Sequence, residues 1–315
     1  MVLISFQNAF VAIIQIFLMG AVGFLLVRRR SMDDAGLKVL SWLSVNVSFP
    51  FFIFYQIFTN FNPSIQVRWW SYPLINISLC LGGALIAASL ASLFKKKNTQ
   101  EWVAVSSFHN AGYIPLLLIT MLPMGEKTQE LYPYVLLTII GFDLCLWSLG
   151  ASLITHHQKL GISWKNFVNA PLISMVLAFL FVLLGLKSFL PEICMKPIKV
   201  IGDSALSIAM LTIGGNLALT HFKKIYWKQI GGAVLIKLLI LPTLALIFLC
   251  FVKMDGPWAL MLMIQACMPS SITLSIIARY SDNPNQSFIN QTIFVTHLLC
   301  CLTIPFFLGL YGRGF

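Results

Sequence analysis

Long apolar stretches separated by short polar connections run through the whole chain. Ten stretches can be delimited, at 5–27, 37–58, 70–94, 102–122, 132–155, 166–189, 198–220, 230–252, 257–279 and 287–310. Each has about the length of the roughly 20 residues that a helix needs to cross the hydrocarbon of a bilayer. The pattern therefore predicts an all-α polytopic membrane protein with ten transmembrane helices and no sizeable soluble domain.

Composition and charge agree with this prediction. Of the 315 residues, 58% are hydrophobic and 10% are charged, whereas soluble domains carry about a quarter charged residues. The formal net charge is +11, but the basic residues form short clusters between apolar stretches, which is typical of membrane proteins and not of nucleic-acid binding. The seven cysteines have no spacing that suggests a metal site, and we expect no metal.

Lysine and arginine are unevenly divided between two sets of connections. Those after the first, third, fifth, seventh and ninth stretches hold 13, against 7 in the remaining connections and the termini. The positive-inside rule then places the clusters Arg28–Arg30, Lys95–Lys97 and Lys223–Lys224 in the cytoplasm. Both termini are predicted to lie outside.

The chain divides into two halves of five stretches each, at 1–157 and 166–315. Because five is odd, a duplication must place the second half upside down, an arrangement common in transporters. Pro115 in the fourth stretch and Pro269 in the ninth lie 154 positions apart, and the same offset relates Asp143 to His297. The sequence therefore predicts an inverted repeat with one proline-interrupted helix in each half.

Each proline is expected to leave one backbone carbonyl without its helical donor. Pro115 cannot donate to the carbonyl of Ala111, and Pro269 cannot donate to that of Gln265. Within hydrocarbon, protein, water or a ligand must satisfy such groups. A plain kink is the alternative for each proline, but the symmetric pair favours a site near the midplane. There the N-terminal ends of the second half-helices can hold an anion.

Polar residues at these interruptions are the predicted substrate-binding groups, together with two amides in the second and seventh stretches. They are Asn110, Tyr113, Pro115, Gln265, Pro269, Ser270, Ser271, Asn46 and Asn216. For Asn46 and Asn216, hydrogen bonding between helices is an equally good interpretation.

Ionisable residues inside apolar stretches are candidates for ion coupling or countercharge, because burying them is costly. Asp143 is the first candidate, as a proton carrier, and its alternative is a fixed ion pair with Lys237 or a hydrogen bond to His297. Lys237 either neutralises a substrate carboxylate, occupies a cation position, or snorkels toward the cytoplasmic edge. Asp203 is expected to cap the helix that it opens, unless it lies deeper and pairs with a cation. His109 and His297 are expected to pack and hydrogen-bond rather than relay protons.

Five short motifs are distributed along the chain, namely NVSFP at 46–50, HNAGYIP at 109–115, GGNL at 214–217, KLLILP at 237–242 and PSS at 269–271. Together they resemble the auxin efflux carrier (PIN-like) family, within the wider bile acid/arsenite/riboflavin transporter group. The resemblance implies a scaffold of stretches 1, 2, 6 and 7 and a transport unit of stretches 3–5 and 8–10. It also implies that helices 4 and 9 cross at Pro115 and Pro269, that substrate binds beside the crossing, and that homodimers form through the scaffold.

Two departures from plant auxin carriers favour the compact prokaryotic branch. Asn110 is followed by alanine and glycine instead of a dense Asn-Pro-Asn signature, and no long hydrophilic loop separates the halves. For that branch the resemblance suggests small carboxylates or similar metabolites and a bacterial inner membrane.

The predicted function is secondary active transport of small organic anions by an elevator-like alternating-access mechanism. Since the sequence contains no P-loop, coupling to a proton or sodium gradient is expected, with no other cofactor. One alternative is a membrane receptor that binds a sterol or lipid without transport. Another is a sodium/proton antiporter of related fold. Enzymatic activity is not expected, because HExxH, GxSxG and paired-aspartate motifs are missing from the sequence.

Overall fold

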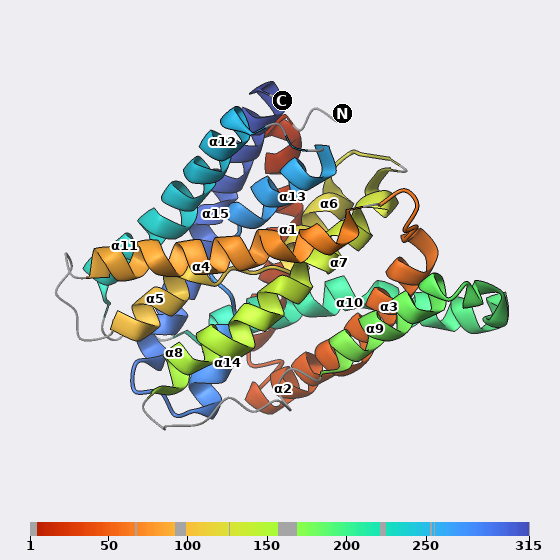
Figure 1. Ribbon diagram of the computed structural model, residues 1–315. Helices are drawn as coiled ribbons and strands as arrows, with labels where there is room; N and C mark the ends of the chain where they lie inside the picture. The colour runs from red at the N-terminus through yellow and green to blue at the C-terminus, as the bar shows by residue number, and fades with distance from the viewer. Residues whose placement is uncertain are drawn as a thin grey trace.

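A computed structural model describes residues 5–66, 68–91, 99–125, 127–156, 169–220, 225–252, 254 and 256–314 (Figure 1). These ranges are helical apart from connecting segments and one isolated β-bridge. Seven of the helices are long and apolar enough to cross a membrane. The clusters Lys95–Lys97 and Lys223–Lys224, on which the predicted orientation depends, lie outside the described residues.

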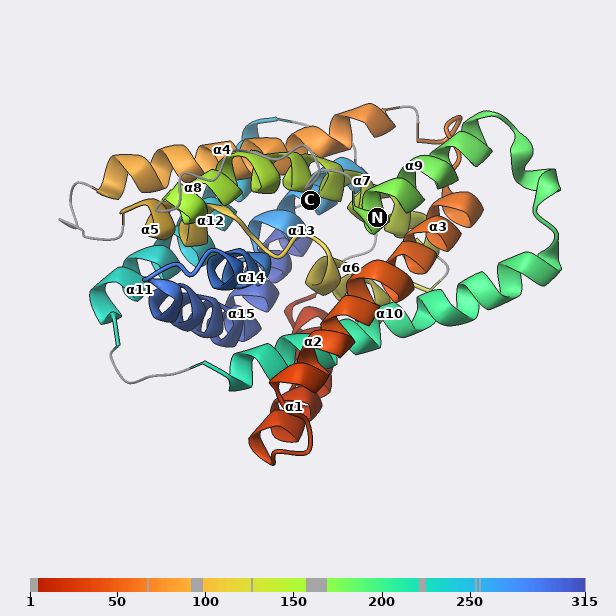
Figure 2. The ribbon, with the colours of Figure 1, turned by 90° about the horizontal axis from the view of Figure 1, so that it is seen from below.

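Two groups of helices lie side by side (Figure 2). The first bundle consists of α1 (Phe6–Arg28), α2 (Asp34–Leu43), α3 (Phe49–Asn60), α9 (Ala170–Leu183) and α10 (Glu192–Ala218). Helices α2 and α3 form one continuous helix, joined by the π-helical turn Ser44–Ser48. A π-turn inserts an extra residue into the helix.

The second bundle contains the remaining helices. They are α4 (Tyr72–Ala91), α5 (Thr99–Ser107), α6 (Tyr113–Met121), α7 (Lys127–Cys145), α8 (Ala151–Thr155), α11 (Trp227–Val234), α12 (Leu241–Phe251), α13 (Gly256–Ala266), α14 (Thr273–Tyr280) and α15 (Gln286–Gly314). The π-helical turns Leu146–Gly150 and Leu235–Ile240 connect α7 to α8 and α11 to α12, so each of these pairs forms one long helix. Short 3-10 turns at Trp69–Ser71 and Leu186–Phe189 complete the helical structure.

The elements largely follow the predicted stretches. Seven stretches are uninterrupted, the sixth is the shorter helix α9, and the fourth and ninth are each divided into two short helices. The seventh was predicted to start at 198, but α10 already begins at Glu192, because Pro191 adopts an extended conformation before the first turn and Glu192 pairs with Lys196 four residues later. The number of membrane crossings stays a prediction.

Capping side chains define several helix starts. Ser5 accepts a hydrogen bond from the backbone N–H of Asn8 at the start of α1, and Asn169 does the same for Leu172 at the start of α9. These caps satisfy donors that the first helical turn leaves free. They explain why these helices begin at small polar residues just before apolar runs.

Each bundle contains a seam at which two helix backbones touch. A Cβ added at Gly214 of α10 would lie 1.8 Å from the carbonyl oxygen of Gly20 in α1. A Cβ added at Gly141 of α7 would lie 1.9 Å from the carbonyl oxygen of Pro73 in α4. Only glycine fits such contacts, so these seams fix each bundle internally.

Between the bundles, α1 contacts α6 and α15, and α3 contacts α7. Aromatic rings fill part of this boundary. The ring of Phe52 on α3 meets that of Tyr132 on α7 edge-on at 5.5 Å, and the ring of Phe49 lies 4.8 Å from that of Tyr113 on α6. Where α3 meets α6 and α7, the boundary thus consists of side-chain contacts, whereas Gly309 of α15 packs closely on the backbone of Phe6 in α1.

Candidate functional site

The two divided helices cross at their interruptions. Helix α5 ends at Ser107 before α6, and α13 ends at Ala266 before α14, which leaves segments 108–112 and 267–272 outside helices. The two segments run antiparallel and pair through a bridge between His109 and Ser270. The backbone N–H of Asn110 donates to the carbonyl of Pro269 at 2.8 Å, and that of Ser271 donates to the carbonyl of Phe108 at 2.9 Å. Polar backbone from both halves of the chain is thus brought together inside the second bundle.

The two prolines do not occupy equivalent positions, contrary to the predicted register. Pro115 is the third residue of α6, whereas Pro269 lies inside the second interruption, before α14 begins. From Ser107 to Ala266 is 159 positions, so the offset of 154 does not superpose the interruptions or support a match of Asp143 with His297. The physical reason is that proline fits the first turn of a helix, where no backbone donor is needed.

The carbonyl that Pro115 leaves without a helical donor is satisfied from the other half of the chain. The side-chain amide of Gln265 donates to the carbonyl of Ala111 at 3.0 Å and to the hydroxyl of Thr138 at 2.8 Å. Gln265 is fully buried, and its Oε1 atom has no partner among the described residues. Gln265 therefore holds the first interruption in place and leaves one acceptor free.

The carbonyl groups at the end of α5 are paired with donors from distant segments. Ser270 Oγ donates to the carbonyl of Val105 at 2.7 Å, and Lys237 Nζ donates to that of Ser107 at 3.2 Å. Lys237 has no exposed surface, so its predicted snorkelling to the cytoplasmic edge is wrong. Its ammonium group lies where the helix dipole places negative charge, which stabilises a cation there.

His109 belongs to a buried hydrogen-bonded chain. Its Nε2 lies 3.0 Å from Asn76 Oδ1, and Asn76 Nδ2 donates to the carbonyl of Thr138 at 2.9 Å. Because Asn76 Oδ1 can only accept, Nε2 carries the proton and Nδ1 is a buried acceptor without a partner among the described residues. Asn76 and Thr138 were missed by the sequence analysis, although an amide inside a long apolar stretch signals such a bond.

Asn110 and Tyr113 lie at the start of the second half of the divided helix, and Tyr113 faces the first bundle. Ser44 Oγ, in the π-helical turn of the first bundle, lies 3.5 Å from the Tyr113 hydroxyl. Asn110 is 7% exposed, whereas Gln265 and Ser270 have no exposed surface. These residues place the accessible edge of the crossing at the boundary between the bundles.

Asp143 and His297 are not joined to each other or to Lys237. In the described part of the chain Asp143 forms neither the ion pair with Lys237 nor the hydrogen bond to His297 that were its alternatives. His297 Nδ1 instead donates to the carbonyl of Ile293 at 2.8 Å, and its buried Nε2 has no described partner. Both fixed-pair interpretations of Asp143 are therefore wrong, and its role as a proton carrier stays a prediction.

The two amides predicted on the first bundle bond within their own helices. Asn46 is exposed and donates to the carbonyl of Trp42 at 3.1 Å. Asn216 donates to the carbonyl of Thr212 at 2.9 Å. Each bond runs back one turn, a local alternative to an interhelical contact. Neither amide forms the helix-to-helix hydrogen bond that the sequence allowed, and the buried polar residues of this region are Ser44 and Ser48.

Asp203 does not cap a helix. Helix α10 begins at Glu192, so Asp203 lies within it and pairs with Lys199 on the same helix at 2.5 Å. The expected cap is wrong because the helix starts earlier than predicted. The alternative partner from elsewhere in the fold is also wrong, since the cation comes from the preceding turn of α10.

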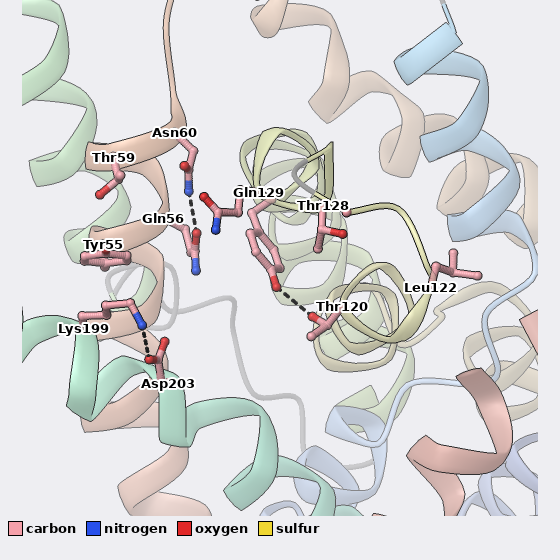
Figure 3. A pocket seen from close by; sticks show the side chains of 12 residues that line it. Tyr55, Gln56, Thr59, Asn60, Thr120, Leu122, Thr128, Gln129, Lys199 and Asp203 are labelled. Carbon is pink, nitrogen blue, oxygen red and sulfur yellow. Dashed lines mark hydrogen bonds and ion pairs between the residues drawn. The ribbon is translucent and has the colours of Figure 1, made fainter. Parts of the chain in front are cut away.

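Lys199 and Asp203 line a cavity of about 480 Å³ between the two bundles (Figure 3). Its other lining residues come from α3, α6, α7 and the connection before α7, and are Tyr55, Gln56, Thr59, Asn60, Thr120, Leu122, Gly125, Thr128, Gln129 and Tyr132. Lys199 and Asp203 face this cavity, and ionisable residues in membrane helices generally face protein or water. The cavity is therefore a polar space between the bundles, which the sequence analysis missed.

No group of three or more His, Cys, Asp or Glu residues in the described ranges could hold a metal ion. The crossing brings together amide, hydroxyl and backbone groups instead. The N-cap of α6, Gly112, has no side-chain cap, and no described residue accepts from the backbone N–H groups of 112–114. Free N–H groups at a helix N-terminus attract anions.

The chain matches one family along nearly its whole length. The family model described as membrane transport protein matches residues 8–160 and again residues 154–308. The two matches indicate that the chain contains the family's unit twice. No curated protein matches the chain.

Proposed function

Because the chain belongs to the auxin efflux carrier family of membrane transport proteins, we propose that it is a secondary active transporter of small organic anions. The observation that carries the proposal is the uncapped N-terminus of α6, at the crossing and at the boundary between the bundles. Its free N–H groups and helix dipole favour a carboxylate there. Asn110 and Tyr113 supply hydrogen-bonding groups beside it.

Lys237 is the proposed countercharge. Its buried ammonium group uses one donor on the carbonyl of Ser107, and an ammonium group has three. A fixed protein cation at this position offsets the negative charge of a bound carboxylate through the low-dielectric interior. The same charge makes a bound sodium ion unnecessary, which supports proton coupling over sodium coupling, with Asp143 as the proton carrier.

The proposed mechanism is alternating access. The second bundle carries the crossing and corresponds to the transport unit implied by the family, whereas the first bundle corresponds to the scaffold. The polar cavity between α3, α10, α6 and α7 is the proposed access route from one side of the membrane. The side-chain contacts of α3 with α6 and α7 support relative motion of the two bundles, with Gly309 of α15 packed on Phe6 of α1 as a close contact between them.

Localisation and partners follow from the same family. The chain is an integral membrane protein, and we propose a bacterial inner membrane with both termini outside, and a homodimer through the first bundle. In the alternative of a sodium/proton antiporter, two acidic residues act together. Asp203 pairs with Lys199 in the first bundle and Asp143 lies in the second, so the described structure does not favour it.

Uptake into proteoliposomes tests the proposal. Purified protein is supplied with a panel of radiolabelled small carboxylates under an imposed pH gradient, and separately under a sodium gradient. Asn110→Ala is expected to reduce uptake at least about tenfold, since a hydrogen bond to a charged group contributes about 1.5–3 kcal/mol. Asn46→Ala is the matched control, because it removes an exposed amide that bonds only within its own helix.

The expected pattern is uptake by the wild type and by Asn46→Ala, and little uptake by Asn110→Ala of equal folded yield. Equal uptake by all three proteins would place the site elsewhere. Binding of carboxylates without any flux would favour the receptor alternative.

A further inference from the structure

One ion pair joins the two bundles. Arg279, near the end of α14 in the second bundle, donates from Nη1 to Asp34 Oδ1 at 3.0 Å and from Nη2 to Asp34 Oδ2 at 2.7 Å. Asp34 is the first residue of α2 in the first bundle. Two parallel N–H···O bonds between a guanidinium and a carboxylate fix orientation as well as distance. The contact therefore sets how the two bundles meet at this place.

Other ion pairs of described residues have a different character. Lys38–Asp34, Lys196–Glu192 and Lys199–Asp203 each join residues four apart on one helix. Such pairs support a helix but do not connect one bundle to the other. Lys38 also binds Asp34 at 3.0 Å and so shares the carboxylate with Arg279.

The ion pair and the polar cavity lie at opposite ends of the same helix. Asp34 begins the helix 34–60, and Gln56 and Asn60 near its other end line the cavity. This helix has 27 residues, which corresponds to about 40 Å along its axis at 1.5 Å per residue. The bundles are thus held together at one face, while a space remains between them at the other. We call these the latch face and the cavity face.

We propose that the Asp34–Arg279 ion pair is a latch that holds the protein in the conformation open at the cavity face. Release of the pair lets the bundles separate at the latch face and favours the conformation in which the cavity is closed. The inference rests on the proposed function only where it assigns this conformational change to alternating access. The ion pair and the cavity between the bundles do not depend on what the protein transports.

The strength of the pair suits a reversible contact. The side chains of Arg279 and Asp34 are 43% and 40% exposed, so solvent screens their attraction. An exposed pair of this kind shifts an equilibrium by up to about fivefold. Contacts of α1 with α15 and of α3 with α7 also join the bundles, so the latch biases the conformational equilibrium without locking it.

Cysteine accessibility at the cavity tests the latch without a substrate. Thr59→Cys places a thiol on the cavity lining, in a background where the exposed Cys194 and Cys250 are replaced by serine. The rate of labelling by a bulky charged maleimide then reports how often the cavity is open. It is measured alone and combined with Arg279→Gln, with Lys38→Gln, and with the charge swap Asp34→Arg plus Arg279→Asp.

We expect Arg279→Gln to reduce the labelling rate by roughly two- to fivefold. Lys38→Gln is the matched control, since it removes the partner of the same carboxylate that lies on the same helix, and it should leave the rate unchanged. The charge swap should restore most of the rate, because it rebuilds an ion pair between the bundles. Elution as a single symmetric peak in size-exclusion chromatography checks that each variant is folded.

An unchanged rate in Arg279→Gln would overturn the latch, as would an equal reduction in Lys38→Gln or a charge swap no faster than Arg279→Gln. These outcomes are separate from those of the transport proposal. A latch effect on labelling without anion uptake by the wild type would refute the transported substrate and keep the latch. Uptake of anions by the wild type, together with an unchanged labelling rate in Arg279→Gln, would refute the latch and keep the transported substrate.

Discussion

The two interruptions that meet at the crossing are built differently. At the second, the N-cap residue Ile272 forms no side-chain cap, but Ser271 before it accepts from the first N–H groups of α14: its Oγ from that of Thr273 at 3.3 Å and its carbonyl from that of Leu274. At the first, Gly112 provides no side-chain cap for α6, and no described group accepts from its first N–H groups. A duplicated unit thus yields one closed and one open helix end. The proposed anion site thus rests on the open end of α6 and not on the repeat itself.

The two carbonyl groups that the prolines leave without a helical donor are also satisfied in different ways. The carbonyl of Ala111 in the first interruption depends on the side chain of Gln265, whereas that of Gln265 itself accepts from the backbone N–H of Met268. The carbonyl of Ala111 is therefore satisfied by a long-range contact, and that of Gln265 by backbone nearby in the chain. Substitutions at each interruption therefore test which of the two forms the site.

The largest effect is expected for Gln265→Leu, which removes the support of the first interruption. The change leaves the buried carbonyl of Ala111 and the hydroxyl of Thr138 without this donor. An unsatisfied buried group costs about 1–3 kcal/mol, so we expect a lower free energy of unfolding and loss of uptake. Thermal unfolding in detergent and proteoliposome uptake measure the two effects. A variant with wild-type stability and uptake would show that Gln265 does not hold the first interruption.

Pro115→Ala should abolish or strongly reduce uptake while the protein stays folded. The alanine N–H supplies the donor that proline lacks and competes with Gln265 for the carbonyl of Ala111. Helix α6 would then extend by one hydrogen bond at the expense of the interruption. The comparison is Pro133→Ala, in helix α7, which lies outside the crossing. Equal uptake by both variants would remove Pro115 from the mechanism.

Gly112→Ser should give α6 a side-chain hydroxyl that accepts from its first N–H groups, as the Ser271 hydroxyl does for α14. The nearest atom to an added Cβ, Ile139 Cδ1, lies at 3.5 Å, so a small side chain fits. A serine cap contributes about 1 kcal/mol, and we expect anion affinity to fall about fivefold as the cap occupies an N–H group. Gly112→Ala is the control for size. If alanine weakens binding as much as serine, sterics and not capping are responsible.

The smallest effect is expected for Ser271→Ala. Loss of the hydrogen bond from the Thr273 N–H to the Ser271 hydroxyl should reduce the free energy of unfolding by about 1 kcal/mol or less. Anion affinity should stay close to that of the wild type, since α14 is not the proposed anion site. Chemical denaturation and equilibrium binding measure the two quantities. A loss of affinity larger than that of Gly112→Ser would move the site to the second interruption.

Much of the helical architecture could be predicted because it depends on local properties of the chain. Apolar stretches located the long helices, and proline with glycine located the interruption before α6. The register between the halves could not be predicted from Pro115 and Pro269, because one proline starts a helix and the other lies inside an interruption. The presence of a proline alone does not show whether it starts a helix or lies inside an interruption.

Of the candidate site, the sequence named most of the residues that meet at the crossing but not their contacts. The pairing of Gln265 with Ala111 and of Lys237 with Ser107 joins residues more than a hundred positions apart. Asn46 was included on polarity alone, and the fold turns it outward. Thr138 was overlooked, since a threonine in an apolar helix gives no signal of a distant partner.

The amino-acid sequence by itself determined that this protein is a helical membrane protein with a duplicated, interrupted unit, since hydrophobic burial and proline geometry act over a few turns of chain. Only the tertiary structure decided which helix end stays without acceptors for its first N–H groups, where the buried lysine places its charge, and which segments the Asp34–Arg279 pair joins. These features depend on hydrogen bonds and ion pairs between segments far apart in the chain, and such contacts exist only once the bundles have packed.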